Sequence, residues 1–135
     1  MPEYRVKQAA DLLGVSDDTL RRWIEQGRLA ATTSAGRQCV DGAELAAFAH
    51  ALAAEVPRPA PMPVVSESAR NRFVGLVTHV IRDTVMAQVE MQCGPHRIVS
   101  LMSREAADDL GLEPGVLAIA AVKSTNVVVE VPDRA

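Results

Sequence analysis

The chain has 135 residues, a formal net charge of −3 and a hydrophobic content of 48%, which excludes a disordered polypeptide. One tryptophan, one tyrosine and two phenylalanines are too few for a surface that stacks single-stranded bases. No apolar run approaches the roughly 18 residues of a membrane span and the start is unlike a secretory signal, so we expect a cytoplasmic protein without a membrane partner.

The first residues predict two short helices joined by a tight turn. Apolar residues recur at helical spacing over 6–13, and Gly14 ends this run. Ser16 then caps a second helix, which extends to Gln26. Two short helices with a glycine in the turn between them form a helix-turn-helix.

The second helix has an inward and an outward side. Leu20, Trp23 and Ile24 form its apolar stripe and are expected in the core. The residues left facing outward or sideways are Asp18, Thr19, Arg21, Arg22 and Glu25.

A polar, turn-rich stretch separates this pair from a third helix. Residues 28–40 predict a small hairpin, or wing. Asp41 and Glu44 have the spacing of a capping box, which predicts a helix over 43–54.

At this point a family resemblance appears over residues 4–53. Val6-Lys7-Gln8-Ala9-Ala10-Asp11-Leu12-Leu13-Gly14-Val15-Ser16, then Thr19-Leu20-Arg21-Arg22-Trp23 and Gly27-Arg28-Leu29, resemble the winged helix-turn-helix of MerR-type regulators and phage excisionases. The resemblance implies that the second helix enters the major groove of double-stranded DNA and that the wing contacts the backbone. The side chains expected to contact DNA are Thr19, Arg21, Arg22, Arg28 and Arg37. The alternative is that some of these arginines only solvate an exposed helix.

A cluster of prolines divides the chain. Pro57, Pro59, Pro61 and Pro63 alternate with other residues, so neither a helix nor a sheet continues through them. We therefore expect a first domain at 1–54, a semi-rigid linker at 55–66 and a second domain at 67–135. Domains this small bury little surface, which favours association into oligomers.

The second half predicts a small β-barrel. The apolar residues alternate or form valine-rich blocks, which indicates strands at about 73–81, 84–91, 97–102, 116–123 and 126–131. Ser103 caps a short helix over 104–110, which Gly111 ends. Five strands with a helix between the third and fourth are expected of a barrel related to the OB-fold. The fold class is thus α+β with two domains.

A second resemblance covers residues 67–132. The block 68–75 looks like the opening of the molybdenum-pterin-binding (Mop) domain, a member of the TOBE group, and blocks at 103–112 and 122–127 follow at the usual distances. The resemblance implies molybdate or tungstate bound at interfaces between subunits. It also implies a homo-oligomer, either a dimer or a trimer of dimers.

The chemistry of the matched positions agrees with this implication. A tetrahedral dianion needs hydrogen-bond donors and one or two positive charges, without thiolates or imidazoles. The positions that match the family's site are Ser68, Ala69, Arg70, Ser103, Lys123 and Ser124. Free amides of the helix after Ser103 are expected to add to this site. One departure is Ala106, where relatives often carry a hydroxyl.

Each oxyanion residue also has a simpler interpretation. Ser103 can be only a helix cap, Ser68 the end of the linker and Lys123 a solvated strand end.

The sequence predicts no metal site. The spacing of Cys39 and Cys93 matches no metal-ligand or redox motif. A soft-metal set of His79, Met91, Cys93 and His96 does not match a known ligand spacing either.

The leading hypothesis is a molybdate-responsive, DNA-binding transcriptional regulator. The first alternative is a molybdate buffer or storage oligomer whose amino-terminal half docks to protein. A second alternative is an architectural DNA-binding factor whose barrel serves only for oligomerisation and binds no oxyanion. No nucleophile–base pair or carboxylate dyad is visible, so an enzyme is not expected.

Overall fold

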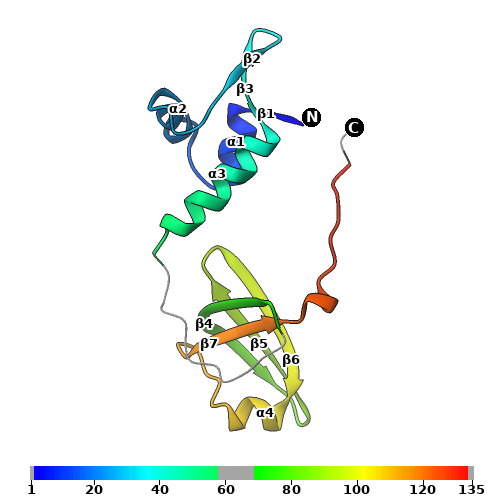
Figure 1. The fold of residues 1–135 in the computed structure, drawn as a ribbon. Helices are drawn as coiled ribbons and strands as arrows, with labels where there is room; N and C mark the ends of the chain where they lie inside the picture. Colours follow the sequence, from blue (N-terminus) through cyan, green and yellow to red (C-terminus); the bar gives the residue numbers. More distant parts are fainter. Residues whose placement is uncertain (1, 58–68, 134–135) are drawn as a thin grey trace. The chain divides into compact units, whose positions relative to one another are not determined.

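The computed structural model describes residues 2–57 and 69–133. The chain divides into two compact units, residues 1–58 and 59–135, which are described separately (Figure 1). The boundary falls within the predicted linker 55–66, of which residues 58–66 lie outside the described part of the chain.

The first unit combines three helices with a small antiparallel sheet of strand order β1-β3-β2. Its elements are β1 (Glu3–Arg5), α1 (Val6–Leu13), α2 (Asp17–Glu25), β2 (Thr32–Ser34), β3 (Arg37–Asp41) and α3 (Gly42–Glu55). The two predicted helices, the hairpin and the third helix are all present. Strand β1, which pairs with β3, was not expected, because three residues are too short to show a period.

The predicted helix ends have the expected chemistry. Gly14 ends α1 with a φ of 72°, a backbone conformation that favours glycine. The Oγ of Ser16 accepts a hydrogen bond from the amide of Thr19 at 3.1 Å, and the carboxylate of Asp41 accepts one from the amide of Glu44 at 3.2 Å. These local bonds fix where α2 and α3 begin.

The core of the first unit is built from small aliphatic residues. Seven residues form its buried cluster: Val6, Ala9, Ala10, Leu20, Leu29, Val40 and Leu45. Trp23, Ile24 and Phe48 pack against this cluster and are partly buried. The predicted apolar stripe of α2 therefore faces the core, which leaves the opposite side of the helix exposed.

The second unit is a curled antiparallel sheet of order β6-β5-β4-β7 with one short helix (Figure 1). Its elements are β4 (Asn71–Arg82), β5 (Met86–Cys93), β6 (His96–Ser103), α4 (Arg104–Asp109), β7 (Leu117–Val122) and the 3₁₀ turn η1 (Ser124–Asn126). The buried cluster lies on the inner side of the sheet, where Val77, Val89 and Met91 meet Ala107 of α4.

The predicted fifth strand at 126–131 is wrong for this chain by itself. Residues 127–133 form neither helix nor strand, and Val127, Val128, Val129 and Val131 are 47%, 81%, 84% and 74% exposed. Valine favours strands, but a strand also needs a neighbouring edge to which its backbone can bond. Four strands are therefore formed, and β6 and β7 are the two edges of an unclosed barrel.

Candidate functional site

The outward side of α2 carries the first group of candidate residues. Arg21 and Arg22 are exposed, and Thr19 is half-buried. The Oγ1 of Thr19 accepts hydrogen bonds from Oγ of Ser16 at 2.9 Å and from Nη2 of Arg22 at 3.4 Å. Hydrogen bonds thus connect the capping residue Ser16 to Thr19 and Thr19 to Arg22. Thr19 and Arg22 lie on one face of α2, as predicted.

The hairpin carries a further arginine close to its tip. Arg37 is exposed and pairs with Ser34 in the β2–β3 ladder. The two residues between them, Ala35 and Gly36, have φ angles of 53° and 75°, as a two-residue hairpin turn requires. Over residues 19–37 four arginines stand against one acid, Glu25, and the acids Asp17 and Asp18 directly precede this segment in the first turn of α2.

Arg28 differs from the other arginines of the predicted DNA-binding set. Its guanidinium carbon lies 5.3 Å from the ring centre of Trp23 and 5.7 Å from that of Phe48. Its Nη2 also forms an ion pair with Glu55 at 3.1 Å. Arg28 is therefore held by contacts within its own unit.

The second candidate site lies where β4 begins and β7 ends. Asn71 pairs with Val122 in the β4–β7 ladder, and its Nδ2 donates to the carbonyl of Val122 at 3.2 Å. Arg70 directly precedes this pair and Lys123 directly follows it, so the register places the two cations at the same end of the ladder. Both are exposed, as is Ser124.

The remaining predicted oxyanion residues have different positions. Ala69 is half-buried directly before Arg70, and Ser68 lies outside the described residues. Ser103 ends β6, the edge strand opposite to β7, so the sheet register does not bring it beside Lys123.

The hydroxyl of Ser103 serves as a helix cap in the single chain. Its Oγ caps α4 by accepting from the amide of Ala106 at 3.1 Å, and the amide of Arg104 donates to the carbonyl of Val85 at 2.7 Å. The amides of Arg104 and Ala106 are therefore not free in the single chain, contrary to what we expected for the start of this helix. A hollow of about 500 Å³ beside it is lined by the carboxylates of Glu105, Asp108 and Asp109 and also by Arg104, which pairs with Asp108 at 3.7 Å.

Comparisons with known proteins divide the chain at the same place. A helix-turn-helix domain family matches residues 3–51, and the TOBE domain family matches residues 67–129. Molybdenum-pterin-binding protein 3 of Clostridium pasteurianum is 35% identical over 66 residues, which are 48% of this chain and 97% of that protein. The chain belongs to the molybdenum-pterin-binding (Mop) family.

Solved structures of similar proteins match about half of the chain. A molybdate-binding protein from Sporomusa ovata is 30% identical and covers 49% of this chain and 98% of its own, with a TM-score of 0.47. The cytoplasmic molybdate-binding protein ModG, in a form with molybdate bound, is 37% identical over 50% of this chain and 48% of its own, with a TM-score of 0.48.

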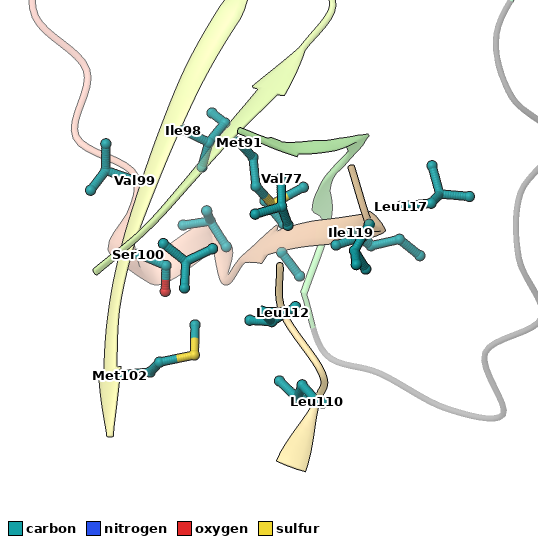
Figure 2. A pocket seen from close by; sticks show the side chains of 16 residues that line it. Val77, Met91, Ile98, Val99, Ser100, Met102, Leu110, Leu112, Leu117 and Ile119 are labelled. Carbon is teal, nitrogen blue, oxygen red and sulfur yellow. The ribbon is translucent and has the colours of Figure 1, made fainter. Parts of the chain in front are cut away.

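This Mop-family chain also has an apolar groove that the sequence did not predict. The groove has a volume of about 690 Å³ and is lined by residues of β6 and β7 together with Val77, Met91 and Leu112 (Figure 2). Its labelled side chains are hydrocarbon apart from the hydroxyl of Ser100 and the sulfur atoms of Met91 and Met102. A bound dianion would lose its hydration there without gaining partners, so the groove is not an oxyanion site.

Metal sites, membrane-spanning helices and reactive cysteines can be examined in the described residues. Residues 2–57 and 69–133 contain no group of three or more His, Cys, Asp or Glu side chains that could hold a metal ion. Within the same ranges no helix is long and apolar enough to cross a membrane. Cys39 and Cys93 are buried and unbridged, and burial raises the pKa of the Cys93 thiol, which lowers its reactivity.

Proposed function

We propose that this protein is a transcriptional regulator that binds double-stranded DNA and responds to molybdate or tungstate. The observation that carries the proposal is the presence, in one chain, of a helix-turn-helix domain with exposed arginines and of a complete Mop-family domain. Such a protein binds its ligands without catalysing a reaction, and it works in the cytoplasm.

In this proposal α2 enters the major groove and the β2–β3 hairpin lies along the adjacent backbone. Arg21, Arg22 and Thr19 face bases or phosphates, and Arg37 contacts a phosphate next to the hairpin tip. The hydrogen bond between Arg22 and Thr19 supports this, because it sets the guanidinium on the exposed face of α2. A single unit with this small number of cationic contacts binds DNA weakly and in a salt-sensitive way. High occupancy of the DNA therefore requires several copies of the protein on one duplex.

The oxyanion is held between copies of the Mop-family unit. Arg70 and Lys123 supply positive charge and Ser124 a hydroxyl from one copy, beside Ser68 and the backbone of Ala69. Ser103 acts from a second copy, since its own chain places it on the edge strand opposite to β7, away from Arg70 and Lys123. Ala106 leaves one fewer hydroxyl donor there than in many relatives.

The carboxy-terminal segment supplies the contact between copies. Residues 127–131 carry four exposed valines, and the groove between β6 and β7 is apolar and flanked by two strand edges. A valine-rich strand from a second copy would bond to these edges and fill the groove, which closes the barrel that one chain leaves open. The assembly is a dimer or a trimer of dimers.

Ligand binding then changes DNA occupancy through the assembly. The oxyanion can shift an equilibrium only as far as it binds one arrangement of copies better than another. Because the ligand lies between Mop-family units, it favours the arrangement in which the interface is complete. The number and spacing of helix-turn-helix units on the DNA change accordingly.

The proposal is tested by selecting duplexes from a random-sequence library with the purified full chain. Binding of the selected duplex is then measured with molybdate, with tungstate, with sulfate and without an added oxyanion. We expect Arg22→Ala and Arg37→Ala to abolish binding, and molybdate or tungstate but not sulfate to change the affinity. Equal affinity at saturating concentrations of all three oxyanions would exclude the regulatory response.

A molybdate buffer remains the second candidate, since residues 1–55 carry six basic and eight acidic side chains. This net negative charge favours docking to a protein over a long-range attraction to DNA. Duplex binding separates the two functions, because a regulator selects a duplex that Arg22→Ala and Arg37→Ala no longer bind. A buffer selects no duplex from the library, and its molybdate affinity is the same with and without Arg22 and Arg37.

A further inference from the structure

Arg28 lies at the junction of the two helices that flank the first unit's core. Its guanidinium is placed against Trp23 of α2 and Phe48 of α3, whose ring centres are 5.3 Å apart at an interplanar angle of 57°. Nη2 of Arg28 also lies 3.2 Å and 3.1 Å from the two carboxylate oxygens of Glu55, the last residue of α3. One side chain therefore joins α2, the middle of α3 and the end of α3.

The backbone around Arg28 fixes its side chain in this place. Gly27 has a φ of 77°, which turns the chain at the end of α2, and the amide of Arg28 donates to the carbonyl of Trp23 at 2.9 Å. The next residue, Leu29, is buried in the core. The backbone of Arg28 is thus fixed between the end of α2 and the buried Leu29, and its guanidinium lies over the ring of Trp23.

This arrangement conflicts with a role in phosphate binding. A guanidinium that contacted DNA would have to leave two aromatic rings and the carboxylate of Glu55. Arg21, Arg22 and Arg37 have no comparable contacts with rings or carboxylates in the described part of the chain.

We propose that Arg28 is a positioning residue, which fixes the DNA-reading helix α2 on α3 through Trp23, Phe48 and Glu55. The proposal rests on the DNA-binding function proposed above. Glu55 is the first residue of the predicted linker, so the same contact ties the orientation of α2 to the point where the chain leaves the first unit.

The contact can be followed without DNA, because Trp23 is the single tryptophan of the chain. Arg28→Met removes the charge but keeps a long side chain, and Glu55→Gln removes the acidic partner. Glu44→Gln, an equal charge change at the start of α3, is the control. We expect both test variants of the full chain to shift Trp23 emission to longer wavelength and to increase its quenching by acrylamide. The control should do neither, and an unchanged emission in Arg28→Met would overturn the proposal.

DNA binding distinguishes positioning from contact by the sign of the effect. If Arg28 positions α2, Arg28→Met and Glu55→Gln each weaken binding of the selected duplex by about threefold to tenfold, and the slope of log affinity against log salt is unchanged. If Arg28 contacts a phosphate, Arg28→Met lowers that slope by about one, and Glu55→Gln strengthens binding. The second pattern would overturn the proposal.

Two further results complete the test. Arg28→Lys keeps the charge but loses the planar group, so a positioning role predicts weakened binding with the wild-type salt slope, whereas full recovery with lysine indicates a contact. If the unsubstituted protein selects no duplex, the proposed function fails. The Trp23 measurements then still decide whether Arg28 holds α2 on α3.

Discussion

Gly75 is a residue of β4 at which β5 leaves no room for a side chain. A Cβ atom at this position would lie 2.3 Å from the carbonyl oxygen of Gln92 and 2.6 Å from Sγ of Cys93. The nearer atom belongs to the backbone of the adjacent strand, which cannot turn aside as a side chain can. The close approach of the two strands therefore requires glycine here.

Gly75→Ala should lower the free energy of unfolding of the second unit by about 3 kcal/mol, because the added methyl group forces β4 and β5 apart. Gly94→Ala is the matched control. It has no atom within 4 Å of the added Cβ but a φ of 59°, so it should lose only the roughly 1 kcal/mol of a left-handed backbone. Urea unfolding of both variants measures the difference, and equal losses would contradict the crowding at Gly75.

Asp83 gives the second unit a pH-dependent contribution. Its Oδ1 accepts hydrogen bonds from the amides of Met86 at 2.6 Å and Val85 at 2.7 Å, which hold the pKa of the carboxyl below its ordinary value. A lowered pKa in the folded state means that the stabilisation is present at neutral pH. It is lost as the pH falls through the unfolded and then the folded pKa.

Asp83→Asn should therefore be less stable than the wild type at neutral pH, and the gap should close in acid, because only the wild type has this contribution to lose. Urea unfolding at a series of pH values measures the gap. Asp109→Asn removes the same charge from the exposed side of α4 and serves as the control. A gap that does not depend on pH would show that the Asp83 charge is irrelevant.

At the scale of elements, the segment after β7 has the composition of a strand without the neighbours of one. Four valines of 127–131 are largely exposed, and β6 and β7 are the edges of the sheet. An exposed strand-forming segment and an open apolar groove in one chain are complementary, which is the basis for placing the segment of one copy in the groove of another.

Deletion of residues 127–135 should convert the proposed oligomer to monomers, because the groove would lose the strand proposed to fill it. Sedimentation velocity of the full and shortened chains measures the change. Ile81→Asp is the control, since Ile81 is 65% exposed on the same sheet but does not line the groove. An unchanged sedimentation coefficient in the shortened chain would exclude this route of assembly.

At the scale of the whole molecule, ligand binding should stabilise the assembled Mop-family units. At a free molybdate concentration of about 100 times Kd the gain is about 2.7 kcal/mol per site, provided that the unfolded chain does not bind. Calorimetric melting of the full chain should show a transition temperature that rises with molybdate and not with sulfate. Arg70→Ala and Lys123→Ala should each reduce this rise, and a rise retained in both variants would remove the two cations from the site.

The local elements could be read from the sequence because their signals are local. Gly14, Ser16 and Asp41 determine where helices end and begin through bonds to residues within a few positions. The division into two units follows from the prolines, and the strands of the second unit from period-two alternation. The Mop-family domain could likewise be recognised because its sequence blocks follow one another at the spacing usual for the family.

The tertiary structure alone decided which of these residues meet. The register of β4 and β7 places Arg70 and Lys123 at the same end of the ladder, while Ser103 lies on the other edge strand. The contacts of Arg28 with Trp23, Phe48 and Glu55 separate it from the arginines that it resembles in sequence. The valine segment shows the reason most clearly. Its composition determined a preference for strand, but a strand forms only where another edge offers hydrogen bonds, and that depends on neighbours that sequence spacing does not encode.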